Sequence, residues 1–310
     1  MKLINQGKVK DVYDAGSDKL LFVFSDRVSV FDQIIPSEIP RKGETLCRES
    51  AFWFKEVEKL GILTHYLGVP EPNQMLVKRA NVIHDYSKLT PQTKDYQIPL
   101  EIILRWYCAG SFYQALKSGK NKPQDFGLDH VPEYGEKLPE PYFEQTTKFE
   151  DVDRKLTTEE ALKISGLTPE ELEEIKEVCI RIDEMMQYEV GKRGLIHVDG
   201  KKEFAMDSER ELMVIDTFGT ADEDRFWDAK EYEKGNIVEF SKEFVRKYYE
   251  NDVEFKCPVC DDKFSYKQLL DKARAENIPE PAIPPLTEGM VERTSRLYTD
   301  LYRRITGEAF

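Results

Sequence analysis

The 310-residue sequence contains no long hydrophobic run and no cluster of cysteines. No segment approaches the stretch of about 18 apolar residues that spans a membrane. The N-terminal MKLINQGKVK also lacks the apolar core of a signal peptide. The five cysteines are odd in number and far apart, which is unsuited to a disulfide framework and typical of a reducing compartment. We therefore expect a cytoplasmic protein with no membrane partner.

The sequence also lacks an excess of basic residues. It has 45 Lys and Arg against 59 Asp and Glu, a formal charge of -14. A field of this sign repels phosphodiester backbones, which excludes nucleic acid as a general partner. An anionic ligand must therefore bind at a local cluster of Lys and Arg.

Several familiar motifs are absent as well. No Walker A loop occurs, and neither an HRD-type catalytic loop nor a DFG marks a protein kinase. Cys257 and Cys260 form a CxxC in a small excursion (254–264), but no second knuckle or paired histidines stand nearby. Either distant ligands or a second subunit complete a zinc site with these two cysteines, or the cysteines are free or redox-sensitive thiols.

Strand-like and helical segments are mixed without a regular βαβ alternation, which predicts an α+β fold. Residues 1–80 are expected to form an N-terminal β-rich lobe, with a strand at 20–24. Residues 81–310 are expected to form a larger α+β lobe that ends in helices. The polar stretch 81–97 is interpreted as a loop or small insertion.

Helical periodicity and capping residues mark the main helices. The first is predicted over 49–60, with Gly61 as its stop. The longest begins at Thr168-Pro169-Glu170-Glu171, which offers an N-cap, a proline at the first position and a capping-box Glu. Its apolar residues recur at helical spacing until Gly191. Further helices are expected near 241–250, 265–276 and 287–306.

The segment 194–228 is the most informative for chemistry, because two strand-like flanks enclose the turn DSER (207–210). With a two- or four-residue loop, Met206 faces Glu211 and Lys201 faces Asp216. The apolar face then consists of Ile196, Val198, Phe204, Met206, Met213 and Ile215. The charged face consists of Asp199, Lys201, Glu203 and Asp216.

Glu203 and Asp216 are diagonal neighbours in this register, roughly 7–8 Å apart. Two carboxylates at that range can bracket a divalent cation together with water and substrate phosphates. Lys201 between them can bind a substrate anion. The alternative is a solvated hairpin face with an ordinary ion pair. A bulge at Gly200 would change the register.

Two further segments of the sequence contain residues suited to bind an anionic ligand. In GKVKDVY, Lys8 and Lys10 alternate after Gly7, so on a strand both would point the same way towards a nucleotide polyphosphate. Solvated lysines are the alternative.

In LRWYCAGS, Arg105 offers a planar fork, and Ser111 follows a glycine where a helix can begin. Together they suit a phosphate. A surface arginine and a structural N-cap are the alternative, and spacing alone does not show whether Arg225 and Arg246 join them.

Seven stretches together resemble a known family. They are GKVKDVY, SDRVSVFDQIIPSEIPRKG, IPLEIILRWYCAGS, EQTTKFE, HVDGKKEF, ADEDRFWD and KEFVRKYY, in this order. They resemble the SAICAR synthetases (phosphoribosylaminoimidazole-succinocarboxamide synthases) from residue 7 to about 306. The resemblance implies a small antiparallel β lobe over a larger α+β lobe, with ATP in the cleft, somewhat as in ATP-grasp enzymes.

The resemblance also implies the reaction. A nucleotide carboxylate of de novo purine biosynthesis is phosphorylated by ATP with Mg²⁺ and then joined to L-aspartate, giving SAICAR, ADP and phosphate. Such a protein must hold anions together and neutralise developing charge, and needs no nucleophilic side chain. Its partners are therefore small molecules; the oligomeric state stays open.

The resemblance implies roles for individual residues. Those near the nucleotide are Gly7, Lys8, Lys10 and Lys148 at the phosphates, Val77 at the adenine edge, and Glu203 and Asp216 as magnesium ligands. Those on the substrates are Arg105, Ser111 and Arg225 at the ribonucleotide phosphate, and Arg246 on a carboxylate. The catalytic residues are Lys201, also on a substrate carboxylate, Asp153, which orients the aspartate amine, and Asp199.

Some positions depart from the family pattern. Thr220-Ala221-Asp222 replaces Ser or Thr-Pro-Asp, Thr217 stands where an acidic residue often follows, and Val152-Asp153 replaces a His-Asp pair. Two alternatives remain. One is a ligase on the same scaffold with a different acid or amine. The other is a non-catalytic nucleotide-binding module that assembles through zinc at CPVC.

Overall fold

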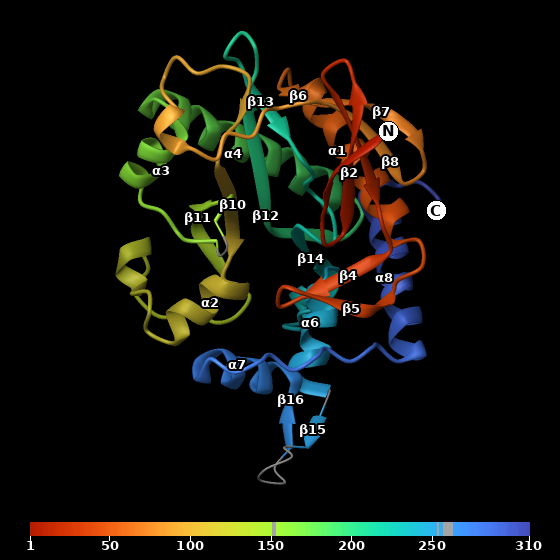
Figure 1. Cartoon of the computed structure of the whole chain (residues 1–310). Helices are drawn as coiled ribbons and strands as arrows, with labels where there is room; N and C mark the ends of the chain where they lie inside the picture. The colour runs from red at the N-terminus through yellow and green to blue at the C-terminus, as the bar shows by residue number, and fades with distance from the viewer. Residues whose placement is uncertain (151–152, 253, 257–262) are drawn as a thin grey trace.

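The computed structural model describes residues 1–150, 153–252, 254–256 and 263–310 (Figure 1). Its elements form an α+β fold, as the sequence predicts. In the described part of the chain, no helix combines the length and apolar character needed to cross a bilayer.

The N-terminal region is built from antiparallel strands. One sheet has the order β1-β2-β3-β8-β7, and a separate hairpin joins β4 to β5. The strands of the sheet are β1 (Lys2–Gln6), β2 (Lys10–Gly16), β3 (Lys19–Phe24), β7 (Tyr66–Glu71) and β8 (Gln74–Lys78). Those of the hairpin are β4 (Arg27–Val30) and β5 (Gln33–Glu38).

The second sheet has seven strands around the long strand β12 (Leu195–Met206). Its main path is β11 (Lys137–Thr147), β10 (Leu100–Tyr107), β12, β13 (Leu212–Ile215) and β6 (Leu63–Thr64). β9 (Tyr96–Gln97) and β14 (Asp224–Asp228) also pair with β12. All pairings are antiparallel except β13 with β6.

The helices agree with the capping motifs but not always with the expected bounds. α4 (Pro169–Gly191) has Thr168 as its N-cap and the expected capping box. α1 (Lys42–Lys59) begins at Lys42 rather than at residue 49. The other helices are α2 (Gly110–Lys117), α3 (Thr158–Ser165), α5 (Ala229–Glu233), α6 (Glu243–Lys247), α7 (Tyr266–Glu276) and α8 (Glu288–Thr306). Short helical turns cover Tyr86–Lys88, Pro123–Phe126 and Tyr248–Asp252, and a small hairpin joins β15 (Glu254–Lys256) to β16 (Lys263–Ser265).

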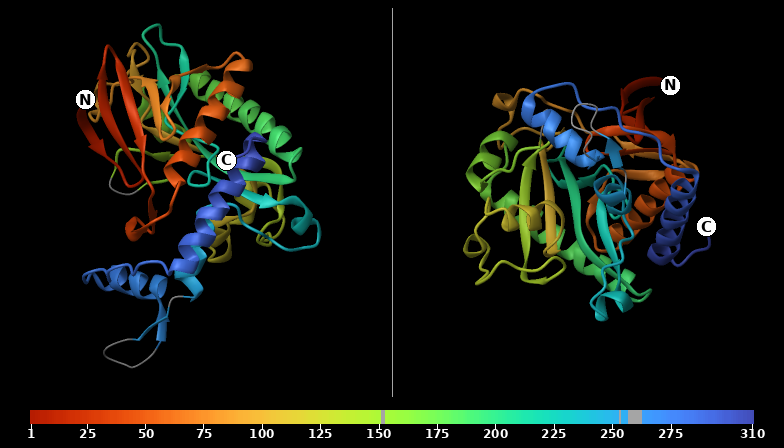
Figure 2. Two further views of the ribbon diagram at one scale, coloured as in Figure 1. Left: turned by 90° about the vertical axis from the view of Figure 1, so that its right-hand side faces the viewer. Right: turned by 90° about the horizontal axis from the view of Figure 1, so that it is seen from below.

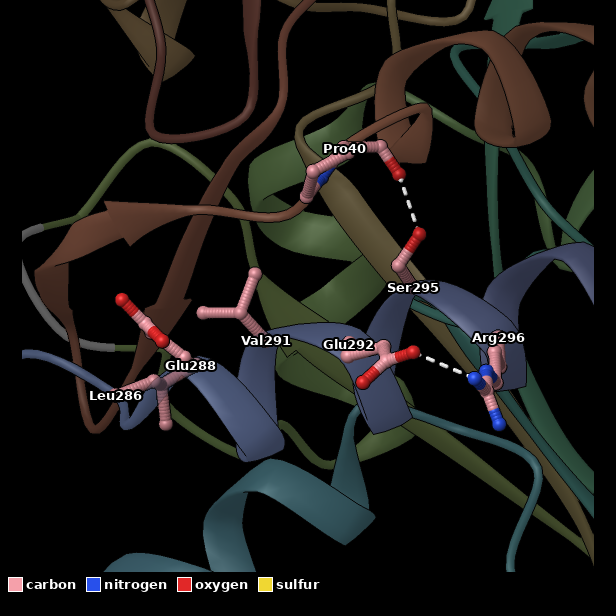
Figure 3. Close-up of a pocket in the computed structure, with 7 residues that line it drawn as sticks. All are labelled: Pro40, Leu286, Glu288, Val291, Glu292, Ser295 and Arg296. Carbon is pink, nitrogen blue, oxygen red and sulfur yellow. Dashed lines mark hydrogen bonds and ion pairs between the residues drawn. The ribbon is translucent and has the colours of Figure 1, made fainter.

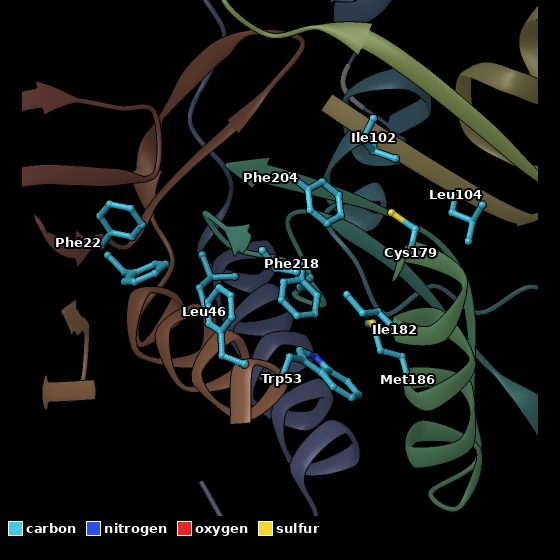
Figure 4. Close-up of a cluster of buried hydrophobic side chains, with 14 of the residues drawn as sticks. Phe22, Leu46, Trp53, Ile102, Leu104, Cys179, Ile182, Met186, Phe204 and Phe218 are labelled. Carbon is cyan, nitrogen blue, oxygen red and sulfur yellow. The ribbon is translucent and has the colours of Figure 1, made fainter. Parts of the chain in front are cut away.

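A shared hydrophobic core lies between the two sheets and their helices. The stripe of α4, including Ile182 and Met186, packs with Leu104 and Phe204 of the seven-stranded sheet (Figure 4). The same buried cluster includes Phe22 of β3 and Trp53 of α1. The division at residue 80 stays a prediction. Because α4 packs against one face of β12 in the sheet (Figure 2), the opposite face can carry charged groups.

The predicted hairpin register is wrong by one residue. β12 and β13 pair Glu203 with Ile215 and Met206 with Leu212, so Lys201 does not face Asp216. Two hydrogen bonds close the turn, from Asp207 N–H to Glu211 and from Arg210 N–H to Asp207, and Arg210 has φ 66°. This left-handed residue lengthens the loop by one position.

The changed register moves two residues to another face, because side chains alternate along a strand. Met213 and Ile215 pack with Ala205 in a small separate cluster. Phe204 and Met206 join the main core, as expected.

Candidate functional site

Three neighbouring strands place charged residues on one face of the large sheet. Arg105 of β10 is the cross-strand partner of Asp199 of β12, and Asp199 is also the partner of Arg225 of β14. Since alternate residues share a face, Lys201 and Glu203 follow Asp199 along the same side. The sheet geometry thus joins two groups of predicted site residues.

The first group is an arginine pair held by Asp199. Asp199 Oδ2 lies 3.0 Å from Arg105 Nη1 and 2.7 Å from Arg225 Nη1. Burial alone would raise the pKa of Asp199, but the two guanidinium groups lower it. Arg105 Nη2 also lies 3.4 Å from Ser111 Oγ in the first turn of α2. Two guanidinium groups, a hydroxyl and a helix N-terminus together suit a phosphate.

Arg246 joins this group through a shared carboxylate. Glu243 Oε2 lies 3.4 Å from Arg225 Nη2 and 3.1 Å from Arg246 Nη1. Gly110 lies under the Arg225 guanidinium: its φ is 54°, and a Cβ there would overlap that group. The close approach of Arg225 to α2 therefore requires glycine.

The second group surrounds Lys201. Its Nζ lies 2.9 Å from Glu101 Oε1, 3.2 Å from Glu203 Oε1 and 3.3 Å from Glu223 Oε2. Burial alone would lower the pKa of Lys201, but these three carboxylates raise it well above the ordinary lysine value. Lys201 is therefore a permanent cation at the centre of the charged face.

The remaining lysines pair with the two predicted metal ligands. Lys148 Nζ lies 2.6 Å from Glu203 Oε1, and Lys10 Nζ pairs with Asp216. Burial and the negative charge of Asp216 raise the pKa of Glu203. The positive charges of Lys148 and Lys201 offset part of this rise. Asp216 follows β13 with φ 62°. This left-handed residue leaves Asp216 near Glu203 although the expected register was wrong.

A small cavity of about 80 Å³ adjoins this group. Val9, Lys10 and Phe24 line it from the N-terminal region, and Asp216 and Glu223 from the segment between β13 and β14. It therefore lies between the N-terminal region and the end of β13, beside the predicted metal ligand Asp216.

A larger groove of about 370 Å³ lies along α8, against Pro40 and Leu286 (Figure 3). None of the predicted site residues lines this groove. The charged face, and not this groove, is therefore the candidate site.

The sequence model of SAICAR synthetase matches residues 3–257. The chain belongs to this family. A phosphoribosylaminoimidazole-succinocarboxamide synthase of Thermoplasma acidophilum is 54% identical over 99% of both chains. The protein of the same name from Thermoplasma volcanium is 52% identical, again over 99% of both.

Solved structures of SAICAR synthetases share the fold. One from Saccharomyces cerevisiae, complexed with SAICAR, aligns with a TM-score of 0.72 at 23% identity, over 99% of this chain and 95% of that one. Another, in complex with ADP, aligns with a TM-score of 0.67 at 24% identity, over 99% and 98%. The predicted fold class is therefore confirmed.

The expected geometry of the SAICAR synthetase motif GKVKDVY is wrong in one respect. β1 ends at Gln6 and β2 begins at Lys10, so Lys8 lies in a bend rather than on the same strand. Lys8 Nζ contacts Asp32 at 2.5 Å, whereas Lys10 contacts Asp216. Gly7 N–H donates to the Lys10 carbonyl at 2.9 Å. The two lysines therefore contact different carboxylates, and Lys10 is the one that reaches Asp216.

Two other predicted site residues have different surroundings, Val77 in the core and Asp153 near the carboxylate of Glu101. Val77 is wholly buried in the core of the N-terminal sheet. Asp153 is exposed as a whole residue. Partial burial of its carboxyl group and the negative charge of the nearby Glu101 raise its pKa. Cys257 and Cys260 lie outside the described residues. Across the described ranges, no three or more His, Cys, Asp or Glu side chains gather as a metal-binding group.

Two residues of the site escaped the sequence prediction. Glu101 lies on the same strand face as Arg105, and counting back by twos along IPLEIILRW would have found it. Glu223 lies in the irregular segment between β13 and β14, where no periodicity marks its direction. Its contact with Lys201 arises only from the tertiary fold.

The burial of His65 predicts that the stability of the folded chain depends on pH. Its ring packs against Phe22 and Phe54, its Nε2 lies 3.2 Å from the Asp216 carbonyl, and burial lowers its pKa to about 3. An unfolded histidine titrates near about 6.5, so below that pH the unfolded chain binds a proton that the folded chain does not. Stability is therefore full above this pH and falls as the pH decreases.

We expect the wild type to lose roughly 1 kcal/mol from this residue between pH 7 and pH 5.5. Urea unfolding at both pH values measures it, with His65→Gln as the comparison. An identical pH dependence in the two proteins would contradict the assignment.

Proposed function

We propose that this protein joins 5-amino-1-(5-phosphoribosyl)imidazole-4-carboxylate to L-aspartate, with ATP as the energy source. Its family catalyses this ligation in purine biosynthesis, and relatives at 54% and 52% identity bear the enzyme's name. The observation that supports it best is the charged sheet face, whose arginine pair, Lys201 and Glu203 lie together, with Lys148 and Lys10 reaching the carboxylates Glu203 and Asp216 from other elements. The proposed location is the cytoplasm.

The chemistry proceeds in two displacements. An oxygen of the substrate carboxylate attacks the γ-phosphorus of ATP, forming an acyl phosphate as ADP leaves. The neutral amine of aspartate then attacks the acyl carbon, loses a proton and expels phosphate, which forms the amide. Both steps need orientation and charge neutralisation rather than a protein nucleophile. We assign the stabilisation of this charge to Lys10, Lys148 and Lys201.

The ribonucleotide phosphate is assigned to Arg105, Ser111 and Arg225. Asp199 holds the two guanidinium groups in fixed orientation, so it acts as a positioning residue. Arg246, linked through Glu243, is assigned to a substrate carboxylate, and Asp153 to the amine of aspartate.

The proposed cofactor is Mg²⁺, with Glu203 and Asp216 as its protein ligands. Asp216 lies close enough to Glu203 for its charge to raise the pKa of Glu203, and both carboxylates lie beside lysines that suit nucleotide phosphates. Two carboxylates, with water and phosphate oxygens, are a donor set that Mg²⁺ accepts. The ion would supply neutralising charge to the phosphates. Gly7 and Lys8 remain assigned to the phosphates, and Val77 to the adenine edge.

The direct test is phosphate release from ATP with Mg²⁺, with the imidazole carboxylate and L-aspartate added singly and together. Turnover only with both establishes the ligase. Turnover with glutamate, glycine or alanine instead would keep the scaffold and change the amine. Nucleotide binding without turnover under any combination would favour the non-catalytic module.

Arg225→Gln tests the phosphate seat. It removes one guanidinium and leaves Asp199 paired with Arg105 alone. We expect KM for the imidazole ribonucleotide to rise about 10- to 100-fold, since charged hydrogen bonds are worth about 1.5–3 kcal/mol, with little change in KM for ATP. Arg303→Gln, at an exposed position of α8, is the matched control. An equal rise in both KM values would place Arg225 elsewhere.

A further inference from the structure

Glu101 is a charged residue of the site that the proposed reaction leaves without a role. It lies on β10, and only 9% of its surface is exposed. Its Oε1 contacts two lysines, Lys201 at 2.9 Å and Lys148 at 3.5 Å. A buried carboxylate that contacts two ammonium groups influences where both of them point.

The same two lysines contact Glu203. Lys148 Nζ lies 2.6 Å and Lys201 Nζ 3.2 Å from Glu203 Oε1. Glu203 is completely buried. An ammonium group on this carboxylate competes with a divalent cation for its lone pairs and repels the cation's charge. Metal binding at Glu203 therefore requires both lysines to have another acceptor.

Glu101 is the second acceptor available to both Lys148 and Lys201. Glu223 contacts Lys201 but has no recorded contact with Lys148 among the described residues, so Glu101 is the carboxylate that the two lysines share apart from Glu203. The contact between Glu101 and Lys201 is already shorter than the one between Glu203 and Lys201. Moving towards Glu101 costs neither lysine its ion pair.

We propose that Glu101 is a positioning residue that draws the ammonium groups of Lys201 and Lys148 off Glu203, leaving Glu203 available to the divalent cation. The inference rests on the proposed metal site. It assigns the paired glutamates of β10 and β12 different tasks: one binds the lysines and the other binds the metal.

The experiment measures nucleotide binding rather than turnover. The Kd of ADP is determined by isothermal titration calorimetry over a series of Mg²⁺ concentrations. The concentration of Mg²⁺ that half-maximally tightens ADP binding reports the metal affinity. In Glu101→Gln we expect this concentration to rise about tenfold, because Lys148 and Lys201 then lose the acceptor that they share apart from Glu203.

A double-mutant cycle separates positioning from the simple loss of a nearby negative charge. In a background that carries both Lys148→Met and Lys201→Met, the two ammonium groups that compete for Glu203 are gone, so Glu101→Gln should change the midpoint by less than about twofold. A through-space effect would persist at about tenfold in both backgrounds and would overturn the proposal. Glu101→Asp, which keeps the charge, should recover part of the loss.

Glu140→Gln, at an exposed position of β11, is the matched control, and circular dichroism checks the fold of each variant. An unchanged midpoint in Glu101→Gln would overturn the role of Glu101 alone. Failure of Mg²⁺ to tighten ADP binding in the wild type would overturn the metal site itself, and this inference with it.

Discussion

Lys201→Ala should lower the kcat of ligation by about a thousandfold. This is the scale of loss seen when a group that stabilises developing charge is removed. Lys201 contacts three carboxylates and holds the central position of the charged face. Without it, the substrate carboxylate loses its cation and is repelled by Glu101, Glu203 and Glu223. Phosphate release with all substrates present measures the effect.

The control for this variant is Lys192→Ala, which removes a half-exposed lysine that pairs with Glu189 and lies over the ring of Tyr188 on the surface. Thermal unfolding of both variants separates a loss of catalysis from a loss of fold. Turnover at the wild-type rate in Lys201→Ala would remove this residue from the site.

Lys42→Met should produce the largest loss of stability. The Lys42 side chain is fully buried, and its Nζ lies 2.8 Å from Asp222 Oδ2. Asp222 also accepts a hydrogen bond from the Tyr298 hydroxyl at 2.5 Å. Burial alone would raise the pKa of Asp222, but nearby groups, Lys42 foremost, lower it to about 2. The variant therefore leaves a buried carboxylate without its nearest cation, which costs about 3–5 kcal/mol.

Urea unfolding at neutral pH measures this loss. Lys59→Met is the control, because Lys59 lies at the other end of α1 with most of its side chain exposed. We expect that control to change stability by less than about 0.5 kcal/mol. A comparably small change in Lys42→Met would mean that Lys242, which lies 3.9 Å from Asp222, replaces the lost cation.

Local sequence chemistry predicted the helix α4 because its start depends on adjacent residues. Thr168 and Glu171 form the capping box within one turn, and the apolar stripe repeats along the helix. The start of α1 could not be found this way. Lys42 and Gly43 have no helical pattern, and Gly43 is needed because a Cβ there would lie 2.6 Å from the Phe24 carbonyl. That requirement comes from a different strand.

The sequence predicted which charged residues of β12 share a face better than it predicted how they approach residues of other elements. Alternation along β12 correctly grouped Asp199, Lys201 and Glu203 on one face. The approach of Asp216 depends on a positive φ, and nothing in the surrounding residues predicts it.

A buried ion pair under the sheet was also beyond prediction. Lys202 of β12 pairs with Asp183 of α4, within the apolar interface that joins these two elements. The pattern of each element alone indicated hydrophobic packing. Only the tertiary fold brings the two charges together.

The central strand β12 also sets a length scale for the substrate. Asp199, which holds the arginine pair, and Glu203, the proposed metal ligand, are four residues apart on one continuous strand. At about 3.3 Å per residue, their backbone positions are separated by roughly 13 Å. A molecule must extend along this interval to occupy both ends at once. Under the proposed assignment, free imidazole carboxylate without its ribose phosphate would reach one end only, and β12 would select substrates by their span as well as by their charge.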